Sequence, residues 1–549
     1  MANTDPNHWF LPADMMPRTP HFTSDNEVTP LIDGAAYMSH LFLRISAMKS
    51  GDYFHQTGWR VTPDQLLEPT MAGPPTFIQQ VTALINSGVN VRAMLWYHFG
   101  SGPIVWTPGG AIAGLAYKHP GENMKFVSTI NNLNRANGAA ILDDRVPTNK
   151  IASHHQKTII LRSGESDAAK HDWAYVGGID ICLDRWDVPA HNSPPQRQKE
   201  FMDAWHDVQV AVRGPAVAQV WENFKQRWND PTKPHGVPGV PGGSNPPAIT
   251  DPPPAGLSIG SQHVQVLRTL ACGGVYSFMP AGEQTVRLAY ERAIDRAQHY
   301  IYIEEQYFWP CTLIEKLKQA ADRGVKIILV LSHKYDIPGI SIVHERMRAN
   351  AINHIRGSSP TNVYVYHLQQ AGLDKDIYVH AKLMIVDDCY VAVGTANIGR
   401  RSHTTDSELH LGVVDADTVP GLMKGAGVQV CRFAKELRLA LWREHLGLPD
   451  SSSIDDPILG LDQWPDQATS NPAAPNRRHH AVCHRVQAPP VDQGALRRFI
   501  ISLLKTGFVL PLAVPDLPLD LVPDAVWESL VPDPEALIRD YIMNVETVC

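Results

Sequence analysis

The sequence predicts an α/β fold built from two pseudo-symmetric halves that meet at one central cleft. In each half, a helical segment precedes an apolar strand, a His-x-Lys triplet opens a further strand, and a glycine turn follows. Strands that alternate with helices are typical of α/β sheets. A duplicated unit with a pseudo-two-fold axis would bring the two triplets together.

The helix and strand of each half are visible in the apolar pattern. In the first half, Thr76 to Val89 has the periodicity of an amphipathic helix, and Asn90 to His98 has the apolar character of a buried strand. In the second half, Thr312 to Arg323 predicts a helix and Val325 to Ser332 a strand. The same order in both halves indicates an internal repeat.

Each half contains a His-x-Lys triplet: His155 and Lys157 in the first half, His380 and Lys382 in the second. Residues two apart in a strand share a face, so each pair points to one side. A single His-x-Lys is weak evidence and is usually part of a surface strand. Its recurrence in the same context indicates a functional site.

Polar residues follow each triplet in the same order. A glycine turn comes after the strand, and an acidic residue then opens the next apolar strand. The turn residues are Gly177, Gly178 and Asp180 in the first half and Gly394 and Asn397 in the second, and the acidic residues are Asp207 and Glu408.

Proline and glycine divide the chain. A Pro/Gly-rich segment at 229–262 cannot hold a helix or a central strand, so it is expected to be a linker or surface crossover. It separates a first half at 1–228 from a second half at 263–450, and residues 451–549 form a C-terminal extension. An ordered surface loop within one domain is the alternative for each break.

The bulk composition restricts the class of partner. With 48 basic and 56 acidic side chains the formal charge is −8, which disfavours nucleic acid, because phosphate contacts require basic surface. We find no signal peptide and no membrane span. Seven scattered cysteines disfavour a disulfide framework. The expected location is cytoplasmic or peripheral to a membrane, with export by a signal-independent route left open.

The triplets and their surroundings resemble the phospholipase D superfamily, whose signature is two copies of HxKxxxxD followed by a glycine turn with Asn. The chain is most similar to the eukaryotic-type enzymes, such as those of plants, over about Trp59 to Gly447. The similar stretches include SHHQKTII, GGIDICLDRWD, WHDVQVAVRGPAV, AYERAIDRAQHYIYIEEQYF, YVHAKLMIVDD and GTANIGRRS. The resemblance implies a duplicated phospholipase D-like α/β sandwich with one shared active site.

The resemblance also implies roles for these residues. His155 would be the nucleophile and His380 the general acid, which requires the two imidazoles to be in opposite protonation states. Lys157 and Lys382 would hold the phosphate oxygens, with Asn397 as a neutral donor. Asp207 and Glu408 would fix the imidazole tautomers, and Asp387 would complete the motif. The expected substrate-binding residues are Gly177, Gly178, Asp180, Gly394, Gln306 and Tyr307, although the aromatic residues around Tyr307 are equally compatible with core packing.

The sequence departs from the family pattern at the first motif, where Arg162 replaces the Asp. We expect Arg162 to point to solvent and to pair with Glu165 or Asp167. In the first glycine turn, Asp180 stands where the second has Asn397. Residues before Trp59 are too few for the lipid-binding domain of many relatives.

The predicted activity is hydrolysis of glycerophospholipids to phosphatidic acid and a free head group, with transfer to an alcohol also open. The partner would be phospholipid at a membrane surface, and protein partners stay unknown. No metal or organic cofactor is required by this chemistry, and the sequence does not indicate calcium. The alternatives are a nuclease or other phosphodiesterase on the same fold, and a lipid-binding scaffold that has lost activity.

Overall fold

The computed structural model describes residues 4–97, 111–146, 152–164, 172–200, 202–237, 239–241, 246–251, 253–254, 256–309, 311–333, 341–465 and 480–483, without the side chains of 111–120 and 341–343. The part of the predicted C-terminal extension beyond residue 483 and the carboxylates Glu165 and Asp167 lie outside these residues.

The first sheet has seven strands. Their order is β1 (Thr23–Ile32), β8 (Val208–Arg213), β6 (Trp173–Gly177), β5 (Thr158–Arg162), β2 (Tyr53–Gly58), β3 (Asn90–Trp96) and β4 (Gly138–Asp143). β2, β3 and β4 are parallel to one another, and the remaining neighbours pair antiparallel.

The second sheet repeats this arrangement strand for strand. Its order is β9 (Gln262–Leu270), β17 (Glu408–Asp415), β16 (Tyr390–Gly394), β15 (Lys382–Val386), β11 (Tyr300–Glu305), β12 (Lys326–Leu331) and β13 (Val363–Gln369). Again three successive strands are parallel and the others antiparallel. The same order and directions in both sheets confirm the predicted duplicated α/β fold.

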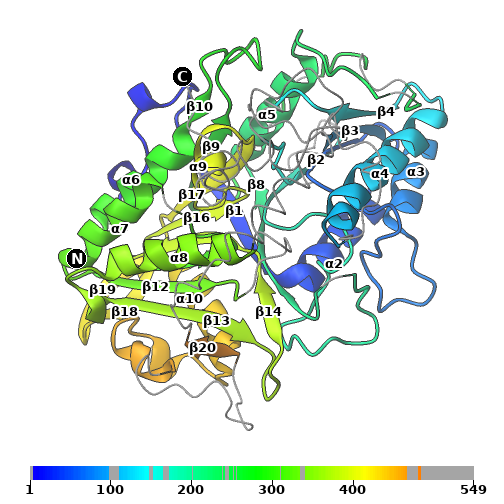
Figure 1. The fold of residues 1–549 in the computed structure, drawn as a ribbon. Helices are drawn as coiled ribbons and strands as arrows, with labels where there is room; N and C mark the ends of the chain where they lie inside the picture. Colours follow the sequence, from blue (N-terminus) through cyan, green and yellow to red (C-terminus); the bar gives the residue numbers. More distant parts are fainter. Residues whose placement is uncertain are drawn as a thin grey trace, which may run out of the picture.

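The helices repeat as well. The first half has α2 (Asp33–Ser46), α3 (Phe77–Asn86), α4 (Ala111–Asn132) and α5 (Ala216–Asn229), and the second has α6 (Thr285–Arg296), α7 (Thr312–Asp322), α8 (Ser341–Arg356) and α10 (Arg432–Leu446). Thr76 begins α3 with a capping box to Gln79, as the predicted helix start requires. In Figure 1, α3 and α4 lie on one side of the molecule and α6, α7 and α8 on the other.

Short elements complete the described chain. They are α1 (Pro6–Trp9), β7 (Trp205–His206), β10 (Glu283–Gln284), β14 (Asp376–Val379), α9 (Arg400–Thr404), β18 (Thr418–Met423), β19 (Ala426–Cys431) and β20 (Ala481–Cys483), with 3-10 turns at Ala13–Met15, Pro360–Asn362, Ser452–Ile454 and Leu459–Gln463. β20 pairs with β13, so part of the C-terminal extension belongs to the second sheet.

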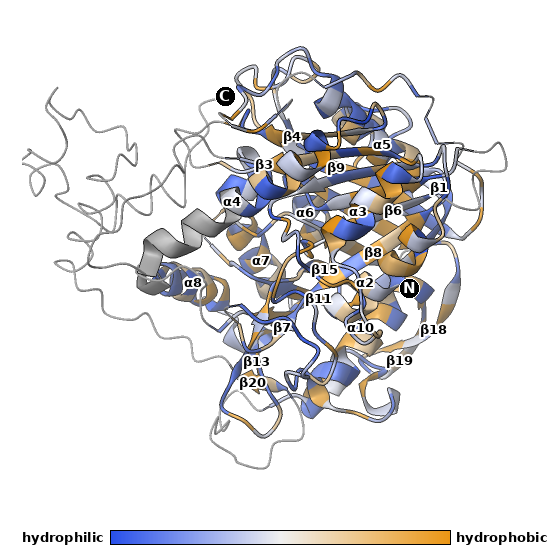
Figure 2. Cartoon of the chain, turned by 90° about the vertical axis from the view of Figure 1, so that its right-hand side faces the viewer, coloured by the Kyte–Doolittle hydropathy of each residue, from blue (hydrophilic) through white to orange (hydrophobic). Residues whose placement is uncertain are grey.

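The two sheets share a core. The largest apolar cluster includes Val176 and Val210 from the first sheet with Val391 and Leu411 from the second. β1 also pairs with β9 at Thr23, which links the sheets by backbone hydrogen bonds. Figure 2 shows the apolar residues concentrated on these interior strands. The shared core fixes the position of one half against the other.

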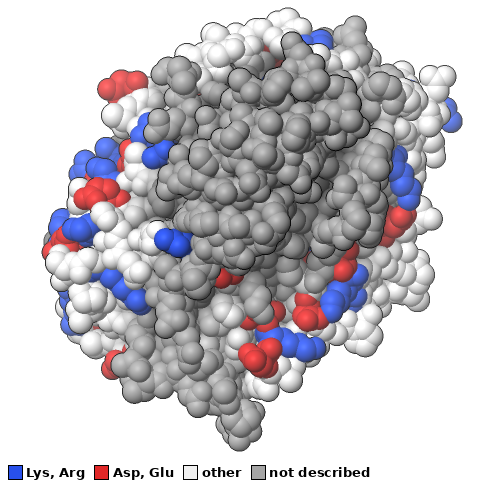
Figure 3. Space-filling model, viewed as in Figure 1, with Lys and Arg blue, Asp and Glu red and all other residues white. Residues whose placement is uncertain are grey.

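The surface and the cysteines add two facts. On the face in Figure 3, basic and acidic side chains are interspersed around the rim. None of the described helices is long and apolar enough to cross a membrane. Among the described residues, Cys182, Cys311, Cys389 and Cys431 are free thiols, whereas Cys272 is in a disulfide.

Candidate active site

Each triplet is held in place by a short parallel bridge to the other half. In the first triplet, His155 N donates to Ser407 O (2.9 Å) and Ser407 N donates to Ser153 O (2.9 Å). In the second, His380 N donates to His206 O (2.8 Å), and β14 runs parallel to β7. Both histidines therefore lie at the boundary between the halves.

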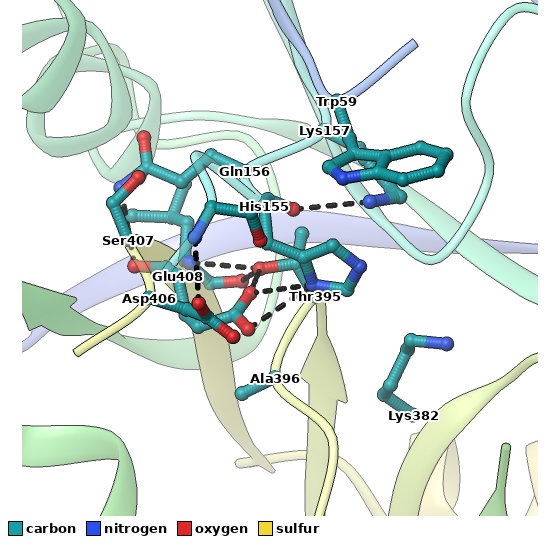
Figure 4. A network of polar contacts seen from close by, with 12 residues as sticks. Trp59, His155, Gln156, Lys157, Lys382, Thr395, Ala396, Asp406, Ser407 and Glu408 are labelled. Carbon is teal, nitrogen blue, oxygen red and sulfur yellow. Dashed lines mark hydrogen bonds and ion pairs between the residues drawn. The ribbon is translucent and has the colours of Figure 1, made fainter. Parts of the chain in front are cut away.

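The orienting carboxylates are exchanged between the halves. His155 Nδ1 lies 3.0 Å from Glu408 Oε2, and His380 Nδ1 lies 2.7 Å from Asp207 Oδ2. A carboxylate can only accept, so Nδ1 carries the proton and Nε2 is left for substrate. In Figure 4, the second ring nitrogen of His155 points into the space between the ammonium groups of Lys157 and Lys382.

The two lysines are braced by neighbouring oxygens. Lys157 Nζ donates to His155 O (3.1 Å) and lies 3.3 Å from Asp180 Oδ2. Lys382 Nζ donates to the His380 carbonyl and to Gln306 Oε1 (2.9 Å). Since an ammonium has three donors, each lysine can still donate to a phosphate oxygen.

Burial perturbs the charges of the whole site. It lowers the pKa of both imidazoles well below the usual range, and the positive charges of Lys157 and Lys382 lower these pKa values further. Burial also raises the pKa of Glu408 to about 7 and that of Asp207 to about 6. The free site therefore favours two neutral imidazoles and does not by itself hold them in opposite protonation states.

The glycines of the two turns are required by packing. A Cβ on Gly177 would lie 2.5 Å from Val208 O, and one on Gly394 would lie 2.4 Å from Leu409 O. A Cβ on Gly178 would lie 2.0 Å from Asp207 Oδ1, the carboxylate that holds His380. These glycines let the turns approach the carboxylate-bearing strands, which places them behind the histidines.

The other expected binding residues differ in their position. Asp180 Oδ1 accepts from Trp59 N (3.1 Å) and Arg60 N (3.2 Å), which leaves its second oxygen beside Lys157. Asn397 is 6% exposed, and its Oδ1 has no hydrogen-bond partner in the described part of the chain. Tyr307 is half-buried and stacks on Trp309, with ring centroids 4.5 Å apart.

Three residues that support the site were not assigned in the sequence analysis. Thr395 Oγ1 donates to Glu408 Oε2 (2.5 Å), and Glu305 Oε2 accepts from Ile398 N (2.9 Å), so both support the second turn. The guanidinium of Arg185 lies 3.6 Å from the ring centroid of Trp205, which is 4.9 Å from that of His380. All three residues lie in stretches that carry the family resemblance, and this position in the sequence could have identified them as candidate site residues.

Asp387 and Arg162 lie at the opposite end of the motif strands. Asp387 accepts from the backbone amides of Gln298 (2.7 Å), His299 (2.9 Å) and Tyr300 (2.8 Å), so it anchors backbone. The predicted solvent-exposed position of Arg162 is wrong. The side chain is buried because its guanidinium packs against the rings of Tyr53 (4.9 Å) and Trp221 (5.3 Å).

Two sequence profiles of known protein families match this chain. The sequence profile described as Phospholipase D matches residues 54–334, which are 281 of the 549 residues. A second profile, described as Cardiolipin synthase, PLD-like domain, matches residues 290–424. The chain belongs to the phospholipase D family, and its core is of the eukaryotic type.

Individual relatives agree with this assignment. Phospholipase D A of Dictyostelium discoideum is 29% identical over 364 residues, 54% of this chain and 27% of that protein. Phospholipase D beta 1 of Arabidopsis thaliana is 24% identical over 519 residues, 72% of this chain and 47% of that protein. Phospholipase D1 of Schizosaccharomyces pombe is 27% identical over 391 residues, which are 54% of this chain and 27% of that protein. The chain spans less than half the length of these three relatives.

Proposed function

We propose that this chain is a phosphodiesterase that hydrolyses glycerophospholipids to phosphatidic acid and a free head group through a phosphohistidine. The observation that carries this proposal is the crossed arrangement of the two His–carboxylate pairs. Each imidazole takes its carboxylate from the other half, so one site contains two oriented histidines and two lysines.

In the first step, Nε2 of neutral His155 attacks phosphorus and forms a P–N bond. The P–O bond to the head group breaks, and His380 donates its Nε2 proton to the leaving oxygen. Lys157 and Lys382 stabilise the charge on the non-bridging oxygens. The first step releases the head group and leaves the phosphatidyl group on His155.

In the second step, His380 removes a proton from water, and the resulting oxygen attacks phosphorus. The P–N bond breaks, phosphatidic acid is released, and His380 regains the proton that it donated. An alcohol that replaces water would give a new phosphodiester by the same step. These steps use only side chains of this chain.

We infer that binding of the substrate causes His380 to become protonated. Because the free site lowers the pKa of both imidazoles, a bound phosphodiester anion between the two ammonium groups would offset their charge and raise both values. His380 would then share its proton with the leaving oxygen, while Glu408 keeps the other imidazole oriented.

Two lines of support favour a lipid substrate. The formal charge of −8 disfavours a nucleic-acid phosphodiesterase, and the relatives reported above are named phospholipases D. The only support for an inactive lipid-binding scaffold was the presence of Arg162 in the first motif. Because Arg162 is buried against two aromatic rings, it has a packing role, and this support is removed.

The deciding experiment measures head-group release from vesicles of phosphatidylcholine, phosphatidylethanolamine and phosphatidylglycerol, with single-stranded DNA as a second substrate. We expect phosphatidic acid from at least one lipid, phosphatidylethanol when ethanol is added, and neither product from His380→Ala. Cleavage of DNA without lipid turnover would replace the proposal with the nuclease alternative. No turnover of either substrate would contradict both.

A further inference from the structure

A second group of ionisable side chains lies behind the active site, at the boundary between the halves. Asp33 at the start of α2, His191 in the loop before β7, His206 in β7 and Glu444 in α10 each place one ligand atom within 4.8 Å of the others. Asp33, His191 and His206 are completely buried.

The nitrogen–oxygen contacts within this group are close in length to the ligand–ligand distances of a tetrahedral site, and either oxygen of Asp33 can serve as its ligand atom. His206 Nδ1 lies 3.0 Å from Asp33 Oδ1 and 3.2 Å from Glu444 Oε1. His191 Nε2 lies 3.4 Å from Glu444 Oε1 and 3.7 Å from Asp33 Oδ2. Four ligands at zinc bonding distances of about 2.0–2.1 Å are about 3.3 Å apart, which is the middle of this range.

The outer nitrogens of both imidazoles are held as in a metal site. His206 Nε2 contacts Glu304 Oε2 (2.8 Å), and His191 Nδ1 contacts Asp187 Oδ2 (3.3 Å). Glu304 is itself fixed by His445 Nε2 (2.8 Å). Histidines that ligate metals nearly always donate their other N–H to a carboxylate or carbonyl, which fixes the tautomer.

Asp33 gives the independent indication of a ligand. Its side chain is fully buried, yet Oδ2 has no hydrogen-bond partner in the described part of the chain. His191 Nε2 is 3.7 Å from this oxygen, which is too long for a hydrogen bond. Buried carboxylate oxygens are rarely left unpaired, and here the orphan oxygen lies beside His191.

We propose that Asp33, His191, His206 and Glu444 bind one divalent transition metal of the zinc type. Two imidazole nitrogens with two carboxylates suit zinc, whereas calcium and magnesium prefer oxygen ligands in larger shells. From the sequence we expect the reaction to require no metal, and a structural ion is compatible with that expectation.

The role of the metal is structural. Three ligands come from the first half and Glu444 from the second, so the ion joins the two halves. His206 also precedes Asp207, and its carbonyl accepts from His380 N (2.8 Å), while Asp33 N donates to Asp207 O (2.9 Å). The metal would therefore hold the backbone that positions the His380–Asp207 pair.

The test uses the full chain and reads metal directly. We expect about one zinc ion per chain by elemental analysis, a lower melting temperature after chelation, and recovery with Zn²⁺ but not with Ca²⁺. Co²⁺ should give the visible absorption of a tetrahedral site. Because the readout is metal content and stability, failure of the proposed lipid hydrolysis would leave this test unaffected.

Variants sharpen the assignment. His191→Gln should abolish stoichiometric binding, and Glu304→Gln should weaken metal affinity by about 10–100-fold through the loss of an outer partner. His354→Gln, which removes an exposed contact to Glu315, is the matched control and should bind normally. If a variant does not fold, the wild-type chain still decides.

Metal content and melting temperature of the wild-type chain can also contradict the proposed metal site. A wild-type chain that holds no metal after purification with added Zn²⁺, and whose melting temperature responds to neither chelator nor Zn²⁺, overturns the proposal. The four side chains would then be a network of protonated histidines and carboxylates.

Discussion

The two halves agree at one end of the motif strands and differ at the other. At the start of β5 and β15, both carry His-x-Lys and both take a carboxylate from the opposite half. At the far end, Asp387 binds three backbone amides, whereas Arg162 packs on two aromatic rings. The end that faces the cleft is alike in the two halves, and the end that faces away is free to diverge.

The first half solves the structural task of Asp387 with another residue. The carboxylate of Asp52, in the loop before β2, accepts from Lys49 N (2.7 Å) and Gly164 N (2.9 Å). It thus ties the loop before β2 to the end of β5. A carboxylate on the neighbouring loop has replaced the motif carboxylate, so its loss from the motif carries no information about activity.

The largest expected effect falls on the histidines. His155→Ala and His380→Ala should each lower kcat by at least about 10³-fold, because each removes a reacting group. With a ³²P-labelled p-nitrophenyl phosphodiester, whose leaving group needs little acid catalysis, His380→Ala should retain label on His155, and His155→Ala should retain none. Label on His380 would reverse the two roles, and more than a few per cent of the wild-type rate in either variant would contradict a two-histidine mechanism.

The crossed carboxylates should differ in the step that they support. Glu408→Gln and Asp207→Asn should each lower kcat by about 10²–10⁴-fold, because an amide stabilises the wrong tautomer of its histidine. A p-nitrophenyl phosphodiester needs little acid catalysis, so it should rescue head-group release in Asp207→Asn but not in Glu408→Gln. Equal rescue of both would show that the carboxylates act on one shared step.

The pH dependence of kcat/KM tests the role of the lysine in the second motif. Burial lowers the pKa of Lys382 to about 8, so this side chain is charged below that pH and neutral above it. We expect kcat/KM to fall as pH rises through about 8 and the fall to be absent from Lys382→Arg. Burial raises the pKa of Glu305 to about 8 in the same window, so Glu305→Gln is the control in which the fall should persist.

The smallest effects are expected at the diverged strand ends. Asp387→Ala should cost about 2–4 kcal/mol of unfolding free energy, since buried amides lose their acceptor. Arg162→Ala should cost about 1–2 kcal/mol through lost ring contacts and keep activity within about threefold. Chemical denaturation and turnover measure both. Loss of activity in folded Arg162→Ala as complete as in His155→Ala would place that arginine in the reaction.

The sequence by itself determined the duplication and the four His and Lys positions. These depend on local order: the alternation of apolar residues, the two-residue spacing within a strand, and the recurrence of a turn and an acidic residue. The predicted strand at Lys382 to Val386 is β15, and Glu408 opens β17 as expected. Such features need no knowledge of which segments meet in space.

Only the tertiary structure decided which partners meet. Asp33 and Glu444 are far in the chain from His191 and His206, and nothing in their spacing indicates a common site. The exchange of Asp207 and Glu408 depends on how the two halves pack against each other. The burial of Arg162 depends on how β2 and α5 pack around the end of β5 within the first half. A strand pattern tells which side of a residue faces inward, but the groups that it meets there are set by elements distant in the sequence.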